Sequence, residues 1–335
     1  MNAPPYFMSK WVKPLLDAKK TILTVSVELS EEEAEKLHNA NLRLVRLNPT
    51  AFFSVGEYDT LYVTEKFVEK CVKELDLETI VEKLRKAVKD LPISLSYWTL
   101  RFEHCSAKDV AYHLFNEIVP DVVGVTLAPS GQAFACHRSR MDVLLILSLL
   151  SERVLMMDRE YKELRYRYIH LRPLVTNFDV EWRLFYIDNR LVAVSQYYVD
   201  VPQSAKRYYY AISEERAENI VRRVIESAEE ARKVITDVLN ELKNYVIDVM
   251  YGAYPSKIEE VEYEGKRARA ISHCSTPAID INPLILEERD EMFATQTYTG
   301  LFTLEELKKL AEKDSNQVPV RYLTIKGVQE IKISA

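Results

Sequence analysis

Apolar residues that alternate, and others that recur at helical spacing, divide the chain into expected strands and helices. Residues 166–175, 180–187 and 191–199 alternate as strands do, and Asp188 and Asn189 supply a turn between the last two. This pattern predicts a three-stranded meander. After it, apolar residues recur at steps of three and four from Ile220 to Leu242, which predicts one long amphipathic helix with a buried stripe.

The first half of the chain mixes short strands with capped helices. Ser30 followed by Glu33 has the pattern of a capping box, and a second box at Thr303 predicts a short helix near the end of the chain. A hairpin that ends near Cys136 leads into a helix at 141–150, whose almost wholly apolar sequence indicates burial. The expected strands of this half lie at residues 21–27, 42–47, 61–64 and 94–103.

Composition places the chain among globular proteins. Its 335 residues are 47% apolar and 29% charged, which suffices for two or three lobes with a sizeable core. A formal charge of −6 argues against a general nucleic-acid binder. The longest apolar run, 143–150, is far too short for a membrane span. No leader pattern is seen at the N-terminus, so we expect an intracellular, cytoplasmic protein with reduced thiols.

Several common sites are excluded by motif. The four cysteines lack C-x-x-C spacing, and no ladder of histidine and cysteine surrounds them, so zinc is not expected. Only 7 glycines are present, and they form neither a P-loop nor a dinucleotide-binding turn. A nucleotide would therefore have to bind through a different kind of site.

Acidic side chains on two expected strands form the strongest chemical signal. Residues 277–283 read Pro-Ala-Ile-Asp-Ile-Asn-Pro, so Asp280 and Asn282 point to the same face of a strand. Carboxylate and amide oxygens suit Mg²⁺ that carries nucleotide phosphates. Alone, the triplet is a weak signal, because a strand that runs into an Asx-Pro turn explains it better. Asp248 lies on a second β-branched strand, where antiparallel pairing could bring it close, and residues 257–272 between them read as a hairpin arm.

The order of five motifs resembles the ATP-grasp superfamily, and most closely the cell division cycle 123 family and related small ATP-grasp proteins. The resemblance covers roughly residues 122–310. It implies an α+β fold in which two lobes grip ATP, preceded here by an α/β lobe at 1–105. The implied ATP-grasp domain is 106–335, with a small lobe at 106–165 and a large lobe at 166–335. The motifs are Leu-Arg-Pro at 171–173, Glu-Trp-Arg-Leu-Phe at 181–185, Val-Ala-Val-Ser-Gln-Tyr at 192–197, Asp248, and Asp-Ile-Asn-Pro at 280–283.

The resemblance implies roles for these residues, with ATP and Mg²⁺ as cofactors. Adenine would be held near residues 168–171, which include His170 and Leu171. Arg172 and Arg183 would contact phosphate oxygens and act in catalysis, since a guanidinium suits bidentate phosphate contacts. Further ligands would be Glu181 and Gln196 for the nucleotide, and Asp248, Asp280 and Asn282 for the metal.

One position departs from the family pattern. A lysine that reaches the phosphates normally precedes the helix that begins here near Met141, but residues 134–140 contain none. Arg138 or Arg140 could take its place, as could a charged His137.

Two functions from different classes follow. The first is an ATP-dependent ligase that joins an unidentified carboxylate to an amine through an acyl phosphate, by positioning and electrostatic stabilisation. The second is an ATP-dependent assembly chaperone for a translation initiation factor, with little turnover. For the chaperone, the arm around Gly265 and the tyrosine-rich stretch near Tyr208 are candidate contact surfaces. A catalytically dead relative is disfavoured.

Overall fold

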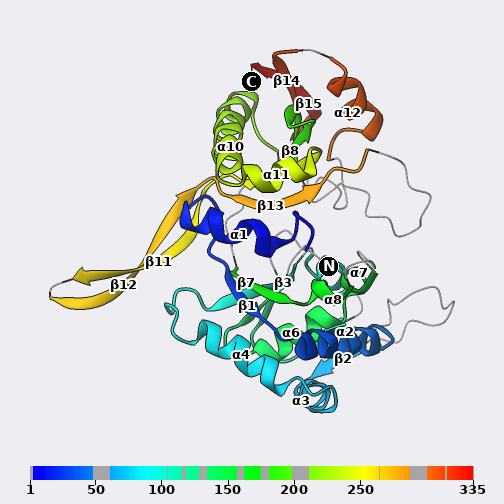
Figure 1. Cartoon of the computed structure of the whole chain (residues 1–335), viewed down its shortest axis with the longest axis vertical. Helices are drawn as coiled ribbons and strands as arrows, with labels where there is room; N and C mark the ends of the chain where they lie inside the picture. The colour runs from blue at the N-terminus through cyan, green and yellow to red at the C-terminus, as the bar shows by residue number, and fades with distance from the viewer. Residues whose placement is uncertain are drawn as a thin grey trace. The chain divides into compact units, whose positions relative to one another are not determined.

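The structure, a computed structural model, divides into two units, each with its own β-sheet (Figure 1). Unit 1 comprises Met1–Ala3 and Thr24–Thr176, and unit 2 comprises Pro4–Leu23 and Asn177–Ala335. Helices and mainly antiparallel strands occur in both units, which confirms the predicted α+β class. The structure describes residues 3–47, 61–103, 105–114, 118–127, 134–156, 162–174, 181–197, 211–263, 265–286, 300–313 and 315–334.

Unit 1 contains a five-stranded antiparallel sheet in the order β1-β7-β3-β6-β5. Its strands are β1 (Val25–Glu28), β3 (Tyr97–Phe102), β5 (Val125–Leu127), β6 (Phe134–His137) and β7 (Tyr168–Pro173). A separate parallel pair is formed by β2 (Leu61–Thr64) and β4 (Ile118–Asp121). The helices are α2 (Glu31–Val45), α3 (Glu65–Glu74), α4 (Glu78–Lys89), α5 (Lys108–His113), α6 (Met141–Leu149), α7 (Glu152–Met156) and α8 (Lys162–Arg165).

Helix α6 forms the centre of unit 1, as its apolar sequence predicts. Every residue of α6 except Asp142 is buried, and the helix packs against α2, α3, α4 and β3. The strand expected at 42–47 is wrong. The capping box at Ser30 starts α2, and its buried face continues through Leu44 and Val45 at helical spacing, so these residues extend the helix.

Unit 2 contains a six-stranded sheet in the order β13-β10-β8-β9-β14-β15, in which only β9 and β14 are parallel. Its strands are β8 (Glu181–Ile187), β9 (Arg190–Gln196), β10 (Tyr245–Met250), β13 (Ala278–Pro283), β14 (Gln317–Thr324) and β15 (Gly327–Ser334). Its helices are α1 (Met8–Asp17), α10 (Glu214–Val234), α11 (Thr236–Leu242) and α12 (Leu304–Ala311).

The two faces of the unit 2 sheet bury different clusters. One face carries Trp182, Leu184 and Ile247 and packs with residues of α1, α10 and α11 in the larger core. The other face carries a smaller cluster that includes Phe185 and Val246 and packs with Leu307 of α12. The smaller cluster covers only part of its face, which leaves room for polar residues on the same side.

Two expectations for this region need correction. The first strand of the expected meander is β7, which pairs with β1 and β3 in unit 1, whereas β8 and β9 form the expected hairpin in unit 2. Asp188 and Asn189 adopt φ of 49° and 60° in its turn. The single long helix is instead α10 and α11, which meet at Ile235, where φ is −117°.

The expected arm is present as a two-stranded hairpin of β11 (Ala253–Tyr263) and β12 (Lys266–Ser275), turned at Gly265. It extends as a yellow ribbon beyond the ends of β13 and α10 (Figure 1). Tyr263 and Val261 near its tip are 68% and 38% exposed.

The expected boundary after residue 105 falls inside unit 1, because β3 pairs on one side with β6 and on the other with β7. Among the described residues, no helix has both the length and the apolar sequence needed to cross a membrane. Tyr208 and its neighbours, and the turn at 129–131, lie outside the described residues.

Candidate functional site

A row of polar residues crosses the unit 2 sheet from strand to strand. Asp280 on β13 lies opposite Asp248 on β10, Asp248 lies opposite Arg183 on β8, and Arg183 lies opposite Ser195 on β9. Directly paired residues project from the same face of a sheet. The four side chains therefore share the face that carries the smaller cluster. Antiparallel pairing thus places Asp248 beside Asp280, as the sequence predicts.

Arg183 and Asp248 form a bidentate ion pair inside unit 2. Arg183 Nε and Nη2 each donate to one carboxylate oxygen of Asp248 at 2.6 Å, and the two side chains are only 4% and 2% exposed. Burial alone would lower the pKa of Arg183, but the Asp248 charge outweighs it and raises the pKa. The pair satisfies both charges, since either one left alone in the interior would be costly.

Tyr197 completes the surroundings of Arg183. Its ring lies under the guanidinium, with 4.0 Å from Arg183 Cζ to the ring centroid, a cation–π geometry. Burial raises the pKa of Tyr197, against the opposing effect of the Arg183 charge. Although Tyr197 ends one of the five motifs, sequence reasoning gave it no role. The sequence signal for Tyr197 is its position, since it is an aromatic residue directly after β9, one of the strands that carry the polar row.

The donor types on β10 and β13 fit a hard cation such as Mg²⁺. Asp280 and Asn282 lie two apart on β13 and share a face, and both are half-buried. Asp280 Oδ1 accepts from the amide of Ile281 at 2.9 Å. Opposed carboxylates repel, and Arg183, whose pKa Asp280 also raises, supplies the positive charge here. Within the described ranges, histidine, cysteine, aspartate and glutamate form no metal-binding group of three.

Glu181 joins the polar row, whereas Gln196 does not. Glu181 lies two residues before Arg183 on β8 and so shares its face. Gln196 pairs with Trp182 and therefore points to the opposite face, where it is fully buried. Its Oε1 accepts from the amide of Leu323 at 2.8 Å, which ties β9 to β14. The observed contact of Gln196 is thus structural.

Unit 1 carries the residues expected to hold adenine. His170 is fully buried on β7, with Nδ1 at 2.9 Å from Ser26 Oγ and Nε2 at 3.3 Å from Glu103 Oε2. Burial lowers the pKa of His170, partly opposed by Glu103. Arg172 lies on the same face and donates through Nε to Thr24 Oγ1 at 3.1 Å. Leu171 lies between them in sequence and points to the other, apolar face.

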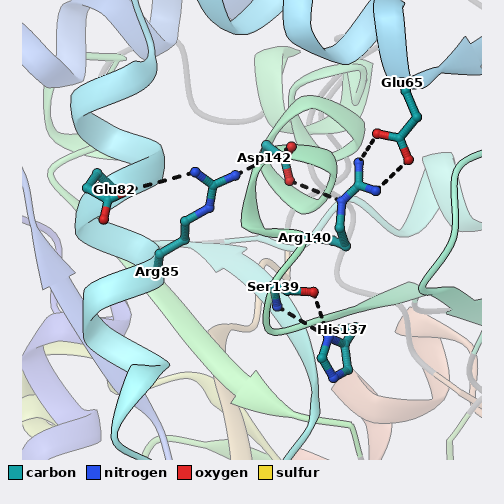
Figure 2. A network of polar contacts seen from close by, with 7 residues as sticks. All are labelled: Glu65, Glu82, Arg85, His137, Ser139, Arg140 and Asp142. Atoms are coloured by element: carbon teal, nitrogen blue, oxygen red, sulfur yellow. Dashed lines mark hydrogen bonds and ion pairs between the residues drawn. The ribbon is translucent and has the colours of Figure 1, made fainter.

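The arginines that could replace the missing lysine already contact unit 1 groups. Arg138 donates to the carbonyl of Leu91 at 2.9 Å. Arg140 donates through both Nη atoms to Glu65 at 2.5 Å, and its Nε lies 3.5 Å from Asp142, as Figure 2 shows. The hydrogen bonds that Arg140 donates to Glu65 raise the pKa of Arg140 above its usual value, against burial.

The surroundings of Arg140 extend to a second arginine. Arg85 on α4 lies 3.6 Å from Asp142 and 3.7 Å from Glu82, while His137 Nδ1 lies 2.8 Å from Ser139 Oγ (Figure 2). Asp142 therefore lies between two guanidinium groups. This network holds Arg140 without any ligand.

The structure thus brings together Glu181, Arg183, Asp248, Asp280 and Asn282 in unit 2. In unit 1, it places His170 and Arg172 on one face of β7 and separates them from Arg138 and Arg140, which follow β6, by the intervening strand β3.

Comparison with known proteins gives matches among solved structures. The chain is similar to Cdc123. C-terminally truncated Cdc123 from Schizosaccharomyces pombe shows 14% identity and a TM-score of 0.46, covering 91% of this chain and 90% of that chain. Cdc123 from Schizosaccharomyces pombe shows 15% identity and a TM-score of 0.41, with 92% of each chain covered. No family model and no curated protein matches the sequence.

Proposed function

We propose that this protein binds ATP together with Mg²⁺ and uses the bound nucleotide to hold a protein partner, with little turnover. The observation that carries the proposal is the row Asp280–Asp248–Arg183 across three adjacent strands of unit 2. Two carboxylates and a guanidinium side by side suit a metal and a phosphate group next to each other.

The residues of the row would contact different parts of the bound Mg²⁺–ATP. Asp280 and Asn282 offer oxygens to the cation from one strand, and Asp248 offers its carboxylate from the next strand. Bound Mg²⁺ would neutralise phosphate charge. Arg183 is held in place by Asp248 and by the ring of Tyr197, so its guanidinium is oriented before any phosphate arrives. A prepositioned donor loses less side-chain entropy when it binds.

Low turnover is supported by the neighbours of Arg138 and Arg140. No lysine occurs at residues 134–140, and both arginines there already contact protein oxygens. For Arg140 to reach a phosphate, it would have to leave the two oxygens of Glu65. This favours binding over the phosphoryl transfer that a carboxylate–amine ligase needs, since that transfer depends on positioned cations.

The partner is proposed to contact the arm formed by β11 and β12. The arm is a sheet of only two strands, and the apolar side chains of Tyr263 and Val261 are exposed near its tip. Exposed tyrosine is enriched at protein interfaces. On the basis of the family resemblance, we propose that this partner is a translation initiation factor.

Calorimetric titration with ATP, with and without Mg²⁺, tests the nucleotide site. Binding that requires Mg²⁺ in the unmodified protein, and that is lost in Asp280→Ala, is the expected result. Glu262→Ala on the exposed arm is the matched control and should bind as the unmodified protein does. Absence of binding in both conditions would refute the nucleotide site.

An assay of released ADP and phosphate under the same conditions tests turnover. We expect at most a slow background release. Multiple turnovers upon addition of an amine and a carboxylate would assign the protein to the ligases and contradict the binding role.

A further inference from the structure

A hollow in unit 2 lies beside helix α12, where β14 continues the sheet next to Ser195 at the end of the polar row. Its volume is about 320 Å³, and it opens between α12, the start of β9, and strands β14 and β15. Its apolar lining includes Val192, Phe302, Leu310 and Pro319. Val192 and Phe302 are nearly fully buried, so this wall is part of the smaller cluster and is fixed by packing.

Basic residues dominate the polar lining of this cavity: Arg190, Lys309, Lys313, Arg321 and Lys332. The two acids among the described lining residues, Glu306 and Glu330, both accept hydrogen bonds from Arg321 of the same lining. Arg321 donates to both oxygens of Glu306 at 2.9 Å and to Glu330 Oε2 at 2.9 Å. The cavity therefore presents an excess of positive charge, although the whole chain carries −6.

Both arginines of the described lining already contact protein groups. The lysine side chains are therefore the positive charges that can adjust to a ligand. Arg190 donates to the carbonyls of Ala311 and Lys313 after the last turn of α12. Lys309 lies 4.0 Å from Glu305, the outer limit of an ion pair. Lys313 and Lys332 are both exposed and line the cavity from two elements, the segment after α12 and strand β15.

We propose that this cavity binds an acidic peptide segment that carries an aliphatic side chain. The aliphatic group would pack on the wall of Phe302 and Leu310, and the carboxylates would meet Lys313 and Lys332. The apolar wall favours a peptide over a small inorganic anion, which would leave this wall in water. The proposal deepens the proposed function, on which it rests only in taking the peptide to be part of the partner.

Fluorescence anisotropy tests the proposal with a labelled probe made of aspartates and glutamates around a central leucine. The unmodified protein should bind it, and binding should weaken as salt is raised. In the double variant Lys313→Glu, Lys332→Glu, the affinity should fall at least about tenfold, since two attractions become repulsions. The matched control is Lys308→Glu, on α12 but outside the cavity lining, which should bind within about twofold of the unmodified protein.

Four results support or overturn the proposal. A probe with asparagine and glutamine in place of the acids should not bind, and a probe with glycine in place of leucine should bind more weakly. Equal affinity in the double variant and the unmodified protein would overturn the proposal. Displacement of the probe by inorganic phosphate at matched ionic strength would overturn it too, and would assign the cavity to small anions.

The test separates this inference from the nucleotide site. The double variant should retain the affinity for ATP and Mg²⁺ of the unmodified protein, because neither lysine belongs to the polar row. A protein that fails to bind ATP but binds the acidic probe through Lys313 and Lys332 would refute the nucleotide site alone.

Discussion

Asp248 and Asp280 face each other directly across the antiparallel strands β10 and β13. Paired positions of this kind bring two Cβ atoms to about 5 Å, close enough for two carboxylates to repel. Arg183 compensates this repulsion from the next strand, and it does so through Asp248. The two carboxylates therefore differ: Asp248 is held in a buried ion pair and would have to share an oxygen between Arg183 and the cation, whereas Asp280 is half-buried and more accessible to a cation.

Asp280→Ala should remove Mg²⁺-dependent ATP binding and leave the free energy of unfolding almost unchanged, because the repulsion from Asp248 that it relieves offsets the attraction to Arg183 that it loses. Asp248→Ala should instead lower the free energy of unfolding by about 3–5 kcal/mol, because it leaves Arg183 buried and unpaired. Urea unfolding of both variants measures the difference. Similar losses of stability in the two variants would contradict the assignment.

Arg183→Ala should weaken ATP binding more than AMP binding, since the proposed partner of Arg183 is a phosphate that AMP lacks. It should also destabilise unit 2 by about 3–5 kcal/mol, because Asp248 loses its partner. The double variant Arg183→Met, Asp248→Leu is the control for stability, because an apolar pair can replace a buried ion pair at little cost. Titration with both nucleotides checks the first statement, and equal losses for ATP and AMP would leave Arg183 a purely structural role.

Gly300→Ala should destabilise unit 2 by about 3 kcal/mol, because alanine is strained in the left-handed backbone conformation and its methyl group would overpack the site. Gly300 has φ of +63°, and an added methyl would lie 2.9 Å from Ser195 Cβ and closer still to its Oγ, the atom that accepts from the amide of Leu301. Gly265→Ala is the matched control, with φ of +72° and no atom within 4 Å of the added methyl, so it should cost only about 1 kcal/mol. Thermal unfolding compares the two, and equal losses would exclude the contact with Ser195.

The stability of unit 2 should depend on Glu306 in acid. Hydrogen bonds from Arg321 lower the pKa of Glu306 from 4.5 to about 2. A carboxyl group with a depressed pKa in the folded state stabilises the fold above its unfolded value of 4.5, and this stabilisation is lost as pH falls toward 2. Glu306→Gln should therefore flatten the loss of stability in this window, measured by urea unfolding at a series of pH values. Glu305→Gln, one position earlier on α12, should keep the slope of the unmodified protein.

Much of unit 2 could be predicted from local patterns. The turn at Asp188 and Asn189, the arm at Gly265 and the capping box at Thr303 are each set by a few adjacent residues. The sequence also indicated two β-branched strands whose antiparallel pairing could bring Asp248 close to Asp280, and the two strands do pair directly. The roles given to these residues remain predictions.

What local patterns could not show was the partner of each strand. Alternation in β7 looks the same whether it pairs with β8 or with β1 and β3, so the expected meander placed it in the wrong sheet. The same reason explains Gln196, whose direction depends on its pairing with Trp182. For Arg140, the sequence could not show that Glu65, 75 positions away, lies against it.

The path of the chain through its two units has a consequence for biosynthesis. Helix α1 contributes Met8, Trp11 and Leu15 to the larger core of unit 2, yet every strand of that sheet lies after residue 180. A growing chain thus makes α1 before the strands on which it packs, with Thr24–Thr176 of unit 1 synthesised between them. Three large apolar side chains of α1 stay uncovered by their native neighbours until β8 and the later strands emerge, so the first helix is a natural place for a ribosome-associated chaperone to bind.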